Sequence, residues 1–152
     1  MVAHRALIVV IVALSVGCAG PDAAIRRRLR SPPPLTRDDI AQLLAATNRA
    51  MGGRVPLLRL GAVSRQMDEK ERNAVFNVLA DARALEDAGL MTIDGTPMRG
   101  LRAPATSPQS EIEATATVWI DAATLLPRRY DYTYAMPGFG DFSYELTFDV
   151  PR

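Results

Sequence analysis

Few side chains in this sequence could act as nucleophiles, general bases or soft metal ligands. The 152 residues include one Cys and one His, Cys18 and His4, and both lie within the first 18 positions. The sequence therefore excludes an internal disulfide, a Cys-based metal site and a Cys/His catalytic pair in the body of the chain. It also lacks the serine-elbow, zinc-protease and phosphate-loop motifs. We expect neither a cofactor nor a catalytic metal.

Carboxylates are the remaining groups that could perform acid–base chemistry. Glu111 and Glu113 would share one face of a strand, and Asp38 and Asp39 are adjacent. Exposed strand positions and stabilisation of a helix N-terminus account for these pairs without catalysis. A carboxylate-dependent hydrolase is therefore the remotest of three functional hypotheses, and an enzyme is not expected.

The N-terminal segment has the pattern of a bacterial export signal. A short basic start precedes an apolar run over 6–16, which is shorter than the roughly 20 residues that a spanning helix needs. The S-V-G-C sequence that ends at Cys18 resembles the bacterial lipobox, in which the cysteine is acylated and becomes the mature N-terminus. The resemblance implies a lipoprotein signal peptide over 1–17 and palmitate-type acylation of Cys18. It also implies a place in the cell envelope, on the outer face of the plasma membrane or on the periplasmic side of an outer membrane.

The segment 18–34 is rich in Arg and Pro, and we expect it to be an extended tether between the acylated Cys and the folded domain over 35–152. Its four arginines are Arg26, Arg27, Arg28 and Arg30. They either lie on anionic headgroups, at about 1 kcal/mol per residue near the surface, or belong to a solvated linker. The membrane is thus the expected partner, through the covalent lipid. The balance of 18 basic against 17 acidic residues gives no reason to expect nucleic acid.

Helical patterns occupy the first half of the expected domain. The stretch 36–51 begins with a capping threonine and two aspartates and ends before two glycines. A second helix is expected over 68–88, with Gly89 just past its end. Between them, 55–63 is apolar but interrupted by Pro and Gly, and it is either an edge strand or a buried loop.

The second half changes to a period of two. Strands are expected over 90–93 and 96–101, joined at the hairpin dipeptide Asp94-Gly95. A loop is expected over 103–110, followed by strands over 111–120, 128–135 and 142–150. The predicted fold class is α+β, a curved antiparallel β-meander packed with two helices and with one apolar face.

The apolar face of the meander is the candidate ligand site. Its expected contact residues are Val118, Ile120, Tyr130, Tyr132, Tyr134, Tyr144, Leu146 and Phe148. Because tyrosine combines an apolar ring with a polar hydroxyl, such a stripe either packs against a helix or lines the mouth of a cavity.

The order of short motifs in this half is similar to that of LolA/LppX-like envelope lipoproteins. The motifs are G-L-M-T-I-D-G at 89–95, V-W-I-D at 118–121, L-P-R at 126–128 and D-V-P at 149–151. The resemblance implies an incomplete β-barrel around helices, with a hydrophobic cavity for acyl chains. Such folds place several long strands before the helix, whereas 36–74 offers one helix and the single interrupted apolar segment 55–63. A shortened relative would have a shallow cup and an exposed sheet edge, which a protein partner could complete.

Two hypotheses therefore lead. In the first, a lipid-anchored, non-enzymatic protein binds or carries a lipid or acyl chain on the apolar face of its sheet. In the second, an anchored interaction module packs that face on its own helices and presents an edge or polar face to an envelope protein.

Overall fold

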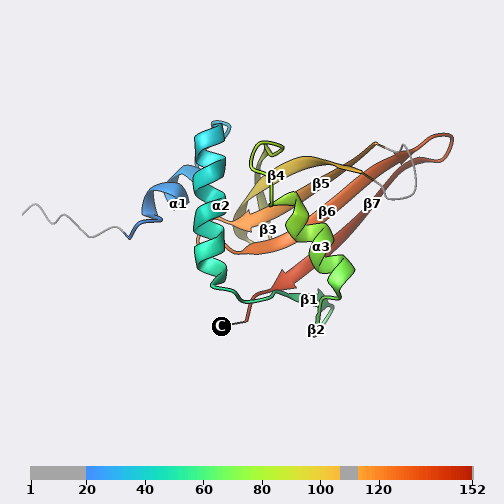
Figure 1. Cartoon of the computed structure of the whole chain (residues 1–152), viewed down its shortest axis with the longest axis horizontal. Coiled ribbons are helices and arrows are strands. Elements are labelled where there is room, and N and C mark those ends of the chain that lie inside the picture. The colour runs from blue at the N-terminus through green and yellow to red at the C-terminus, as the bar shows by residue number, and fades with distance from the viewer. Residues whose placement is uncertain (1–19, 107–112, 152) are drawn as a thin grey trace, which may run out of the picture.

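The structure, a computed structural model, describes residues 20–106 and 113–151. Over these residues the fold is α+β, with an open seven-stranded antiparallel sheet and three helices (Figure 1). The sheet has the order β2-β1-β7-β6-β5-β4-β3. The elements are α1 Ala23–Leu29, α2 Arg37–Met51, β1 Leu57–Leu60, β2 Val63–Gln66, α3 Glu69–Val78, β3 Glu86–Ile93, β4 Thr96–Thr106, β5 Glu113–Asp121, β6 Pro127–Met136 and β7 Gly140–Asp149. The predicted class and the meander over β3 to β7 are confirmed, with three helices where two were expected.

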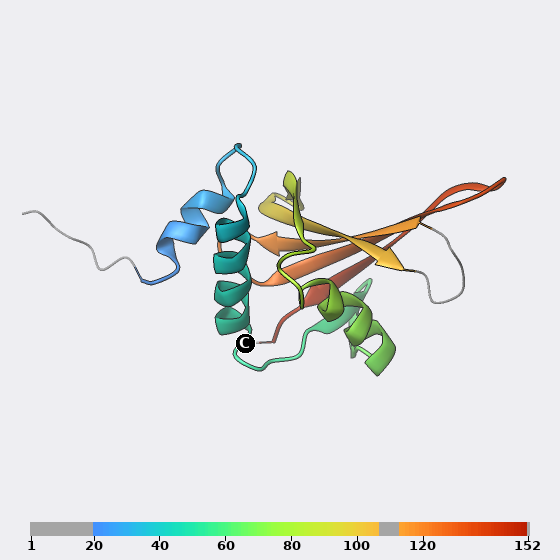
Figure 2. The same cartoon turned by 45° about the horizontal axis from the view of Figure 1, so that its top comes forward.

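The five strands of the meander follow the predicted alternation. Asp94 and Gly95 both have positive φ, 49° and 76°, as a tight hairpin turn between β3 and β4 requires. On the inner face, Leu101, Val118 and Tyr130 lie in register across β4, β5 and β6. The inner face packs against α2 and α3 (Figure 2). The outer face carries polar residues such as Arg129, Asp131 and Glu145.

The helix α2 begins and ends where the sequence predicts. The Thr36 hydroxyl accepts a hydrogen bond from the Asp39 N–H, and the Asp39 carboxylate accepts one from the Thr36 N–H. These contacts satisfy two backbone donors that a helix N-terminus leaves free. Ile40 and Leu43 face the sheet and belong to the buried core.

The second predicted helix is shorter than expected. A capping box between Asp68 and Glu71 begins α3, as expected, but the helix ends at Val78. The Asp81 carboxylate then accepts a hydrogen bond from the Arg83 N–H in a turn, and 86–93 pairs with β4. Gly89 is therefore not a helix cap. Gly89 has a φ of 92° and lies next to a register shift in β3. Strand pairing with β4 outweighs the local helix propensity of this segment.

The stretch 55–63, left open by the sequence, contains β1 and the turn into β2. Leu58 of β1 pairs with Phe148 of β7, so the hairpin extends the meander at its C-terminal edge. The sheet therefore ends at β2, a short strand whose four residues are all exposed.

The loop expected over 103–110 is wrong for its first part, because β4 continues to Thr106. Ala103 and Ala105 pair with Ala116 and Ala114 of β5. Pro104 is tolerated because the pairing with β3 stops at Arg102, so no hydrogen bond is lost on that side.

The expectation of an extended tether over 18–34 is wrong for the described residues 20–34. Residues 23–29 form α1, which packs against α2 and buries Ile25 and Leu29. The Arg28 guanidinium donates hydrogen bonds to the carbonyls of Pro33 and Pro34 and to the Asp39 carboxylate. The two buried apolar side chains and these contacts fix the segment on the domain. Cys18 and the signal peptide over 1–17 lie outside the described residues.

The V-W-I-D motif ends β5 in a tight corner. The Asp121 carboxylate accepts hydrogen bonds from the N–H groups of Ala123 and Thr124, at 2.7 and 3.2 Å. Trp119 lies on the outer face, where its indole N–H donates to Asp131 at 2.7 Å. Within the described part of the chain, no helix is both long and apolar enough to cross a membrane.

Candidate ligand site

A cleft of about 470 Å³ lies between α3 and the inner face of the sheet. One wall is formed by Tyr130 and Tyr132 of β6 and Tyr144 of β7. The opposite wall and the ends are formed by α3, the loop that follows it, and β4. These contribute Lys70, Ala74, Asn77, Val78, Asp81, Ala84, Ala103, Pro104 and Ala105.

The cleft exists because small residues face large ones. Ala74 of α3 and Ala103 and Ala105 of β4 have no side chain long enough to fill the space under the helix. The α3 helix buries only Val75 completely, so it packs loosely on the sheet at this point. Protein interiors are normally packed densely. A larger side chain at the alanine positions would fill this space and close the cleft.

The tyrosine wall is a contiguous aromatic cluster. The ring centroids of Tyr132 and Tyr144 are 5.1 Å apart with an interplanar angle of 27°. Tyr130 lies 6.4 Å from Tyr132 and 6.2 Å from Tyr144. These separations fall in the range of favourable aromatic pairs. The rings therefore form a continuous aromatic surface along this wall.

Burial changes the acidity of two of these tyrosines. Removal from water raises the pKa of Tyr130 well above its ordinary value, and the neighbouring Tyr144 adds to the effect. Burial also raises the pKa of Tyr144. Because both hydroxyls stay protonated at neutral pH, the wall of the cleft carries no charge from these groups.

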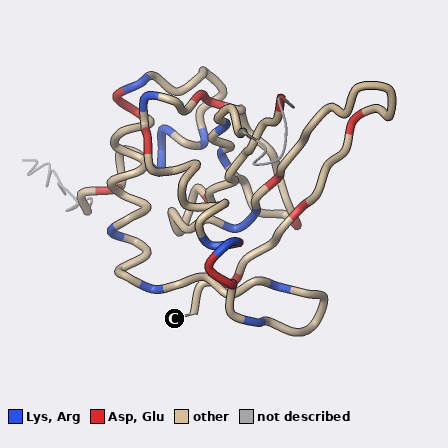
Figure 3. Tube along the Cα trace, turned by 45° about the vertical axis from the view of Figure 1, so that its right-hand side comes forward, with Lys and Arg blue, Asp and Glu red and all other residues tan. Residues whose placement is uncertain are grey.

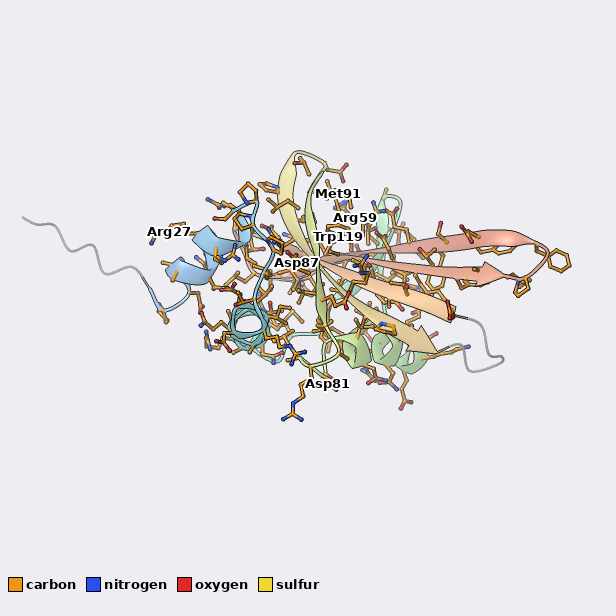
Figure 4. All side chains as sticks on the ribbon, turned by 90° about the horizontal axis from the view of Figure 1, so that it is seen from above. Arg27, Arg59, Asp81, Asp87, Met91 and Trp119 are labelled. Carbon is orange, nitrogen blue, oxygen red and sulfur yellow. The ribbon has the colours of Figure 1, made fainter. Side chains whose placement is uncertain are left out.

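Charged and amide groups lie at the exposed rim. Lys70 and Asn77 come from α3, and Asp81 comes from the loop after it. Figure 4 shows Asp81 on the α3 side of the sheet, opposite the side of Arg59 and Trp119. Among the described residues, no carboxylate lies within ion-pairing distance of Lys70. The cleft thus has an apolar interior and a polar rim.

The structure divides the predicted contact residues into three groups. Tyr130, Tyr132 and Tyr144 line the cleft. The second group, which packs in the buried core and does not reach the cleft, is Val118, Ile120 and Phe148. The third group lies beside the cleft without lining it: Leu146 is half-buried against the core, and Tyr134 lies farther out on β6.

Sequence reasoning missed the wall opposite the tyrosines. The composition of 103–110 predicts a loop, which leaves Ala103 and Ala105 out of the strand. Nothing in the sequence marks the polar rim residues of α3 as part of a site, because the position of a residue in a helix does not indicate which strand the helix will pack against. Ala103 and Ala105 continue the period-two pattern of Leu101 in the preceding strand. This pattern could have identified them as part of the same strand face.

A second, smaller cleft of about 220 Å³ lies at the other end of the sheet. Arg59, Arg128 and Arg129 contribute to it, but each lies within ion-pairing distance of a carboxylate. Arg129 contacts Asp131 at 2.6 Å and Glu145 at 3.0 Å. Because these charges are compensated within the protein, the cleft has no excess positive charge to attract an anion.

The predicted membrane-surface arginines now have defined positions on or next to α1. Arg26, Arg27 and Arg30 are exposed, whereas the guanidinium of Arg28 is directed to the protein by its three hydrogen bonds. Within residues 20–106 and 113–151, no group of three or more His, Cys, Asp or Glu residues could hold a metal ion.

Comparisons with known proteins find no similar protein. No family model matches the chain, and searches of curated proteins and of solved structures find no match.

Proposed function

We propose that this protein is a lipid-anchored envelope protein that binds the apolar chain of a lipid or acyl ligand in the tyrosine cleft. The observation that carries the proposal is the cleft itself, whose volume of about 470 Å³ falls in the range of about 300–1,000 Å³ typical of small-molecule sites. Its apolar interior and polar rim suit an amphipathic ligand. Burial of the chain supplies affinity at about 25 cal/mol per Å² of apolar surface.

The lining of the cleft suits binding rather than catalysis. Tyrosine hydroxyls are protonated near neutral pH, and burial raises the pKa of Tyr130 and Tyr144 further, so they offer hydrogen bonds but not a base. The alanines and Val78 provide only van der Waals contact. The proposed activity therefore needs no covalent step.

The N-terminal sequence supports the anchor. The lipobox-like ending at Cys18 lies five residues before α1 begins at Ala23. Because α1 packs on the body of the domain, an acyl group on Cys18 would hold the domain close to the bilayer. The exposed Arg26, Arg27 and Arg30 would then lie near anionic headgroups. A C18A variant should lose incorporation of labelled palmitate, and continued labelling would contradict the anchor.

The resemblance to LolA/LppX-like lipoproteins supports a ligand site on the same face of the sheet. In that family a curved sheet covers helices and holds acyl chains, and here the cleft lies between the sheet and α3. The sheet is open at β2 and β3, so the proposed form is a half-barrel with a shallow site.

Tyr132→Asp is the test of ligand binding, because it places a charge in the cleft wall. Full-length protein is purified in mild detergent and examined by native mass spectrometry for bound lipid. Uptake of dansylated undecanoic acid is followed by energy transfer from Trp119, the single tryptophan. We expect bound lipid and energy transfer in the wild type and a loss of both in Y132D.

Thr133→Asp is the matched control for Y132D. Thr133 is the next residue on β6, is exposed, and points to the opposite face. It should leave both signals unchanged. Bare wild-type protein with no uptake of the probe would exclude the ligand site.

The interaction module remains a second candidate, because one specific feature favours it. Leu60 at the end of β1 and Val63 at the start of the edge strand β2 pair with each other and are exposed, at 53% and 66%. An exposed strand edge with apolar side chains can pair with an extended segment of another protein. If the wild type takes up no lipid, a Val63→Lys variant that loses an envelope partner recovered by cross-linking would support this function instead.

A further inference from the structure

The β6–β7 hairpin extends beyond the part of the sheet that the helices cover (Figures 1 and 2). Its two faces differ in chemistry. The inner face of its outer half carries Tyr134, paired with Phe142, and Met136. The outer face carries Thr133, paired with Ser143. The hairpin is therefore a two-stranded amphipathic ribbon whose apolar face continues past α3.

The apolar face of this ribbon is continuous with the cleft. Tyr132 belongs to the cleft wall and lies 5.9 Å, centroid to centroid, from Tyr134. Tyr134 in turn stacks on Phe142 at 5.4 Å with an interplanar angle of 17°. We call Tyr134 and Phe142 the outer ladder. Together with the cleft tyrosines they form one unbroken aromatic surface from the core to the hairpin.

The rings farther from the core are more exposed than the innermost ring. Tyr130 at the inner end is 2% exposed, whereas Tyr144 and Phe142 are 45% and 41% exposed. A contiguous row of exposed aromatic rings is unfavourable in water and commonly marks a binding surface. Because the row begins inside a cleft, the occupant of the cleft is the group best placed to cover it.

The charges of the hairpin disfavour an anionic membrane as the occupant. Between Tyr130 and Leu146 the chain contains no Lys or Arg. Of its three acidic residues, Asp131 and Glu145 pair with Arg129, and Asp141 lies on the outer part of the hairpin. Figure 3 shows the long hairpin with acidic positions and no basic ones along its outer part. Anionic lipid surfaces attract basic segments, and this segment offers them no basic residue.

We infer that the outer ladder is a second part of the ligand site, and that the ligand is an amphiphile with a long apolar chain. The inner part of the chain lies in the cleft and its distal part lies along Tyr134 and Phe142. This inference rests on the proposed function and adds a preference for chain length to it. A short chain fills the cleft alone and makes no use of the ladder.

The test compares fatty acids of increasing length as competitors of dansylated undecanoic acid on the full-length protein. Decanoate, myristate and stearate displace the probe from the wild type and from a Tyr134→Ser/Phe142→Ser double variant. We expect the double variant to lose about tenfold in stearate affinity, which corresponds to about 1.4 kcal/mol. Its decanoate affinity should stay within about twofold of the wild type, because the cleft is untouched.

A Thr133→Ala/Ser143→Ala double variant is the matched control, because it alters the same two strands on the opposite face. It should bind all three fatty acids as the wild type does. Circular dichroism and thermal unfolding of each variant establish that the domain is folded.

Four results would overturn the inference. Equal losses for decanoate and stearate in the ladder variant would show a general effect on the cleft. If the ladder variant binds both decanoate and stearate as tightly as the wild type does, the ladder is not part of the site, although the cleft still is. A wild-type dimer, seen by sedimentation and lost only in the ladder variant, would assign the surface to a second copy. Failure of every fatty acid to displace bound probe, or failure of the probe to bind, would remove the proposed function as well.

Discussion

Arg99 and Asp87 form a buried ion pair that joins the N-terminal segment to the sheet. The Arg99 Nε donates to the Asp87 carboxylate at 2.7 Å, and Nη2 donates to the other carboxylate oxygen. The same guanidinium donates to the carbonyls of Ser31 and Pro33, at 2.7 and 2.9 Å. Arg99 is fully buried. One side chain of β4 therefore satisfies both the carboxylate of β3 and the backbone between α1 and α2.

Replacing Arg99 by Met should destabilise the protein strongly. The substitution leaves the Asp87 carboxylate and two backbone carbonyls without their donor in a buried place. Removing one partner of a buried ion pair typically costs about 3–5 kcal/mol. The free energy of unfolding in urea measures the effect, and proteolysis between α1 and α2 should become faster as the segment is released.

Arg102→Met is the control for Arg99→Met. Arg102 lies on the same strand and faces Glu86 at 3.4 Å, but both side chains are exposed. Exposed pairs contribute about 0–1 kcal/mol. Similar losses in the two variants would mean that the pair of Arg99 and Asp87 has no special role.

Stability should fall in acid because of Asp87. Burial alone would raise the pKa of Asp87, but the hydrogen bonds from Arg99, Gly89 and Leu35 outweigh it and lower the pKa below its usual range. A lowered folded-state pKa stabilises the fold above the unfolded value of about 3.9, and this contribution is lost as pH falls through the folded value. Asp87→Asn should therefore be less stable than the wild type at neutral pH, and the difference should shrink below about pH 4. Urea unfolding across this range measures it, and a constant difference would contradict the assignment.

Gly100→Ala should destabilise the outer face of the sheet. A Cβ at position 100 would lie 2.8 Å from the ring of Trp119 and 2.9 Å from the Cβ of Ala88. Overpacking of this kind typically costs about 1–3 kcal/mol. In a Trp119→Val background the ring is absent, so Gly100→Ala should cost clearly less. Equal costs in the two backgrounds would show that Trp119 is not the obstacle.

The parts of the fold that depend on local pattern could be predicted from the sequence. The strands of the meander have apolar residues at every second position, and Asp94-Gly95 fixes one turn. Thr36 and Asp39 mark the start of α2. In each case the residues that determine the structure lie within a few positions of one another.

The parts that depend on distant contacts could not be predicted in this way. Residues 23–29 are too few to form a stable helix alone, and α1 is held by contacts of Ile25 and Leu29 with the rest of the core. The end of α3 is set by pairing of β3 with β4, against the helix propensity of the alanines after Val78. The cleft has the same origin, since its tyrosine wall follows the strand pattern but its α3 wall depends on tertiary placement. Arg99 lies two positions before Leu101 on the same strand, so the period-two pattern could have placed it on the apolar face.

Tyr130 should make the fold sensitive to alkali. Burial, with the neighbouring Tyr144, raises the pKa of Tyr130 above its ordinary value, so the folded state keeps this proton after the unfolded chain has lost it. Stability from this group is thus fully present below the unfolded pKa of about 10 and decreases as pH rises above it. Tyr130→Phe removes the titrating hydroxyl and should make the loss of stability between about pH 10 and 12 less steep. Urea unfolding at several alkaline pH values measures the slope, and the same slope in both proteins would show that Tyr130 ionises freely and that the inner end of the cleft is wet.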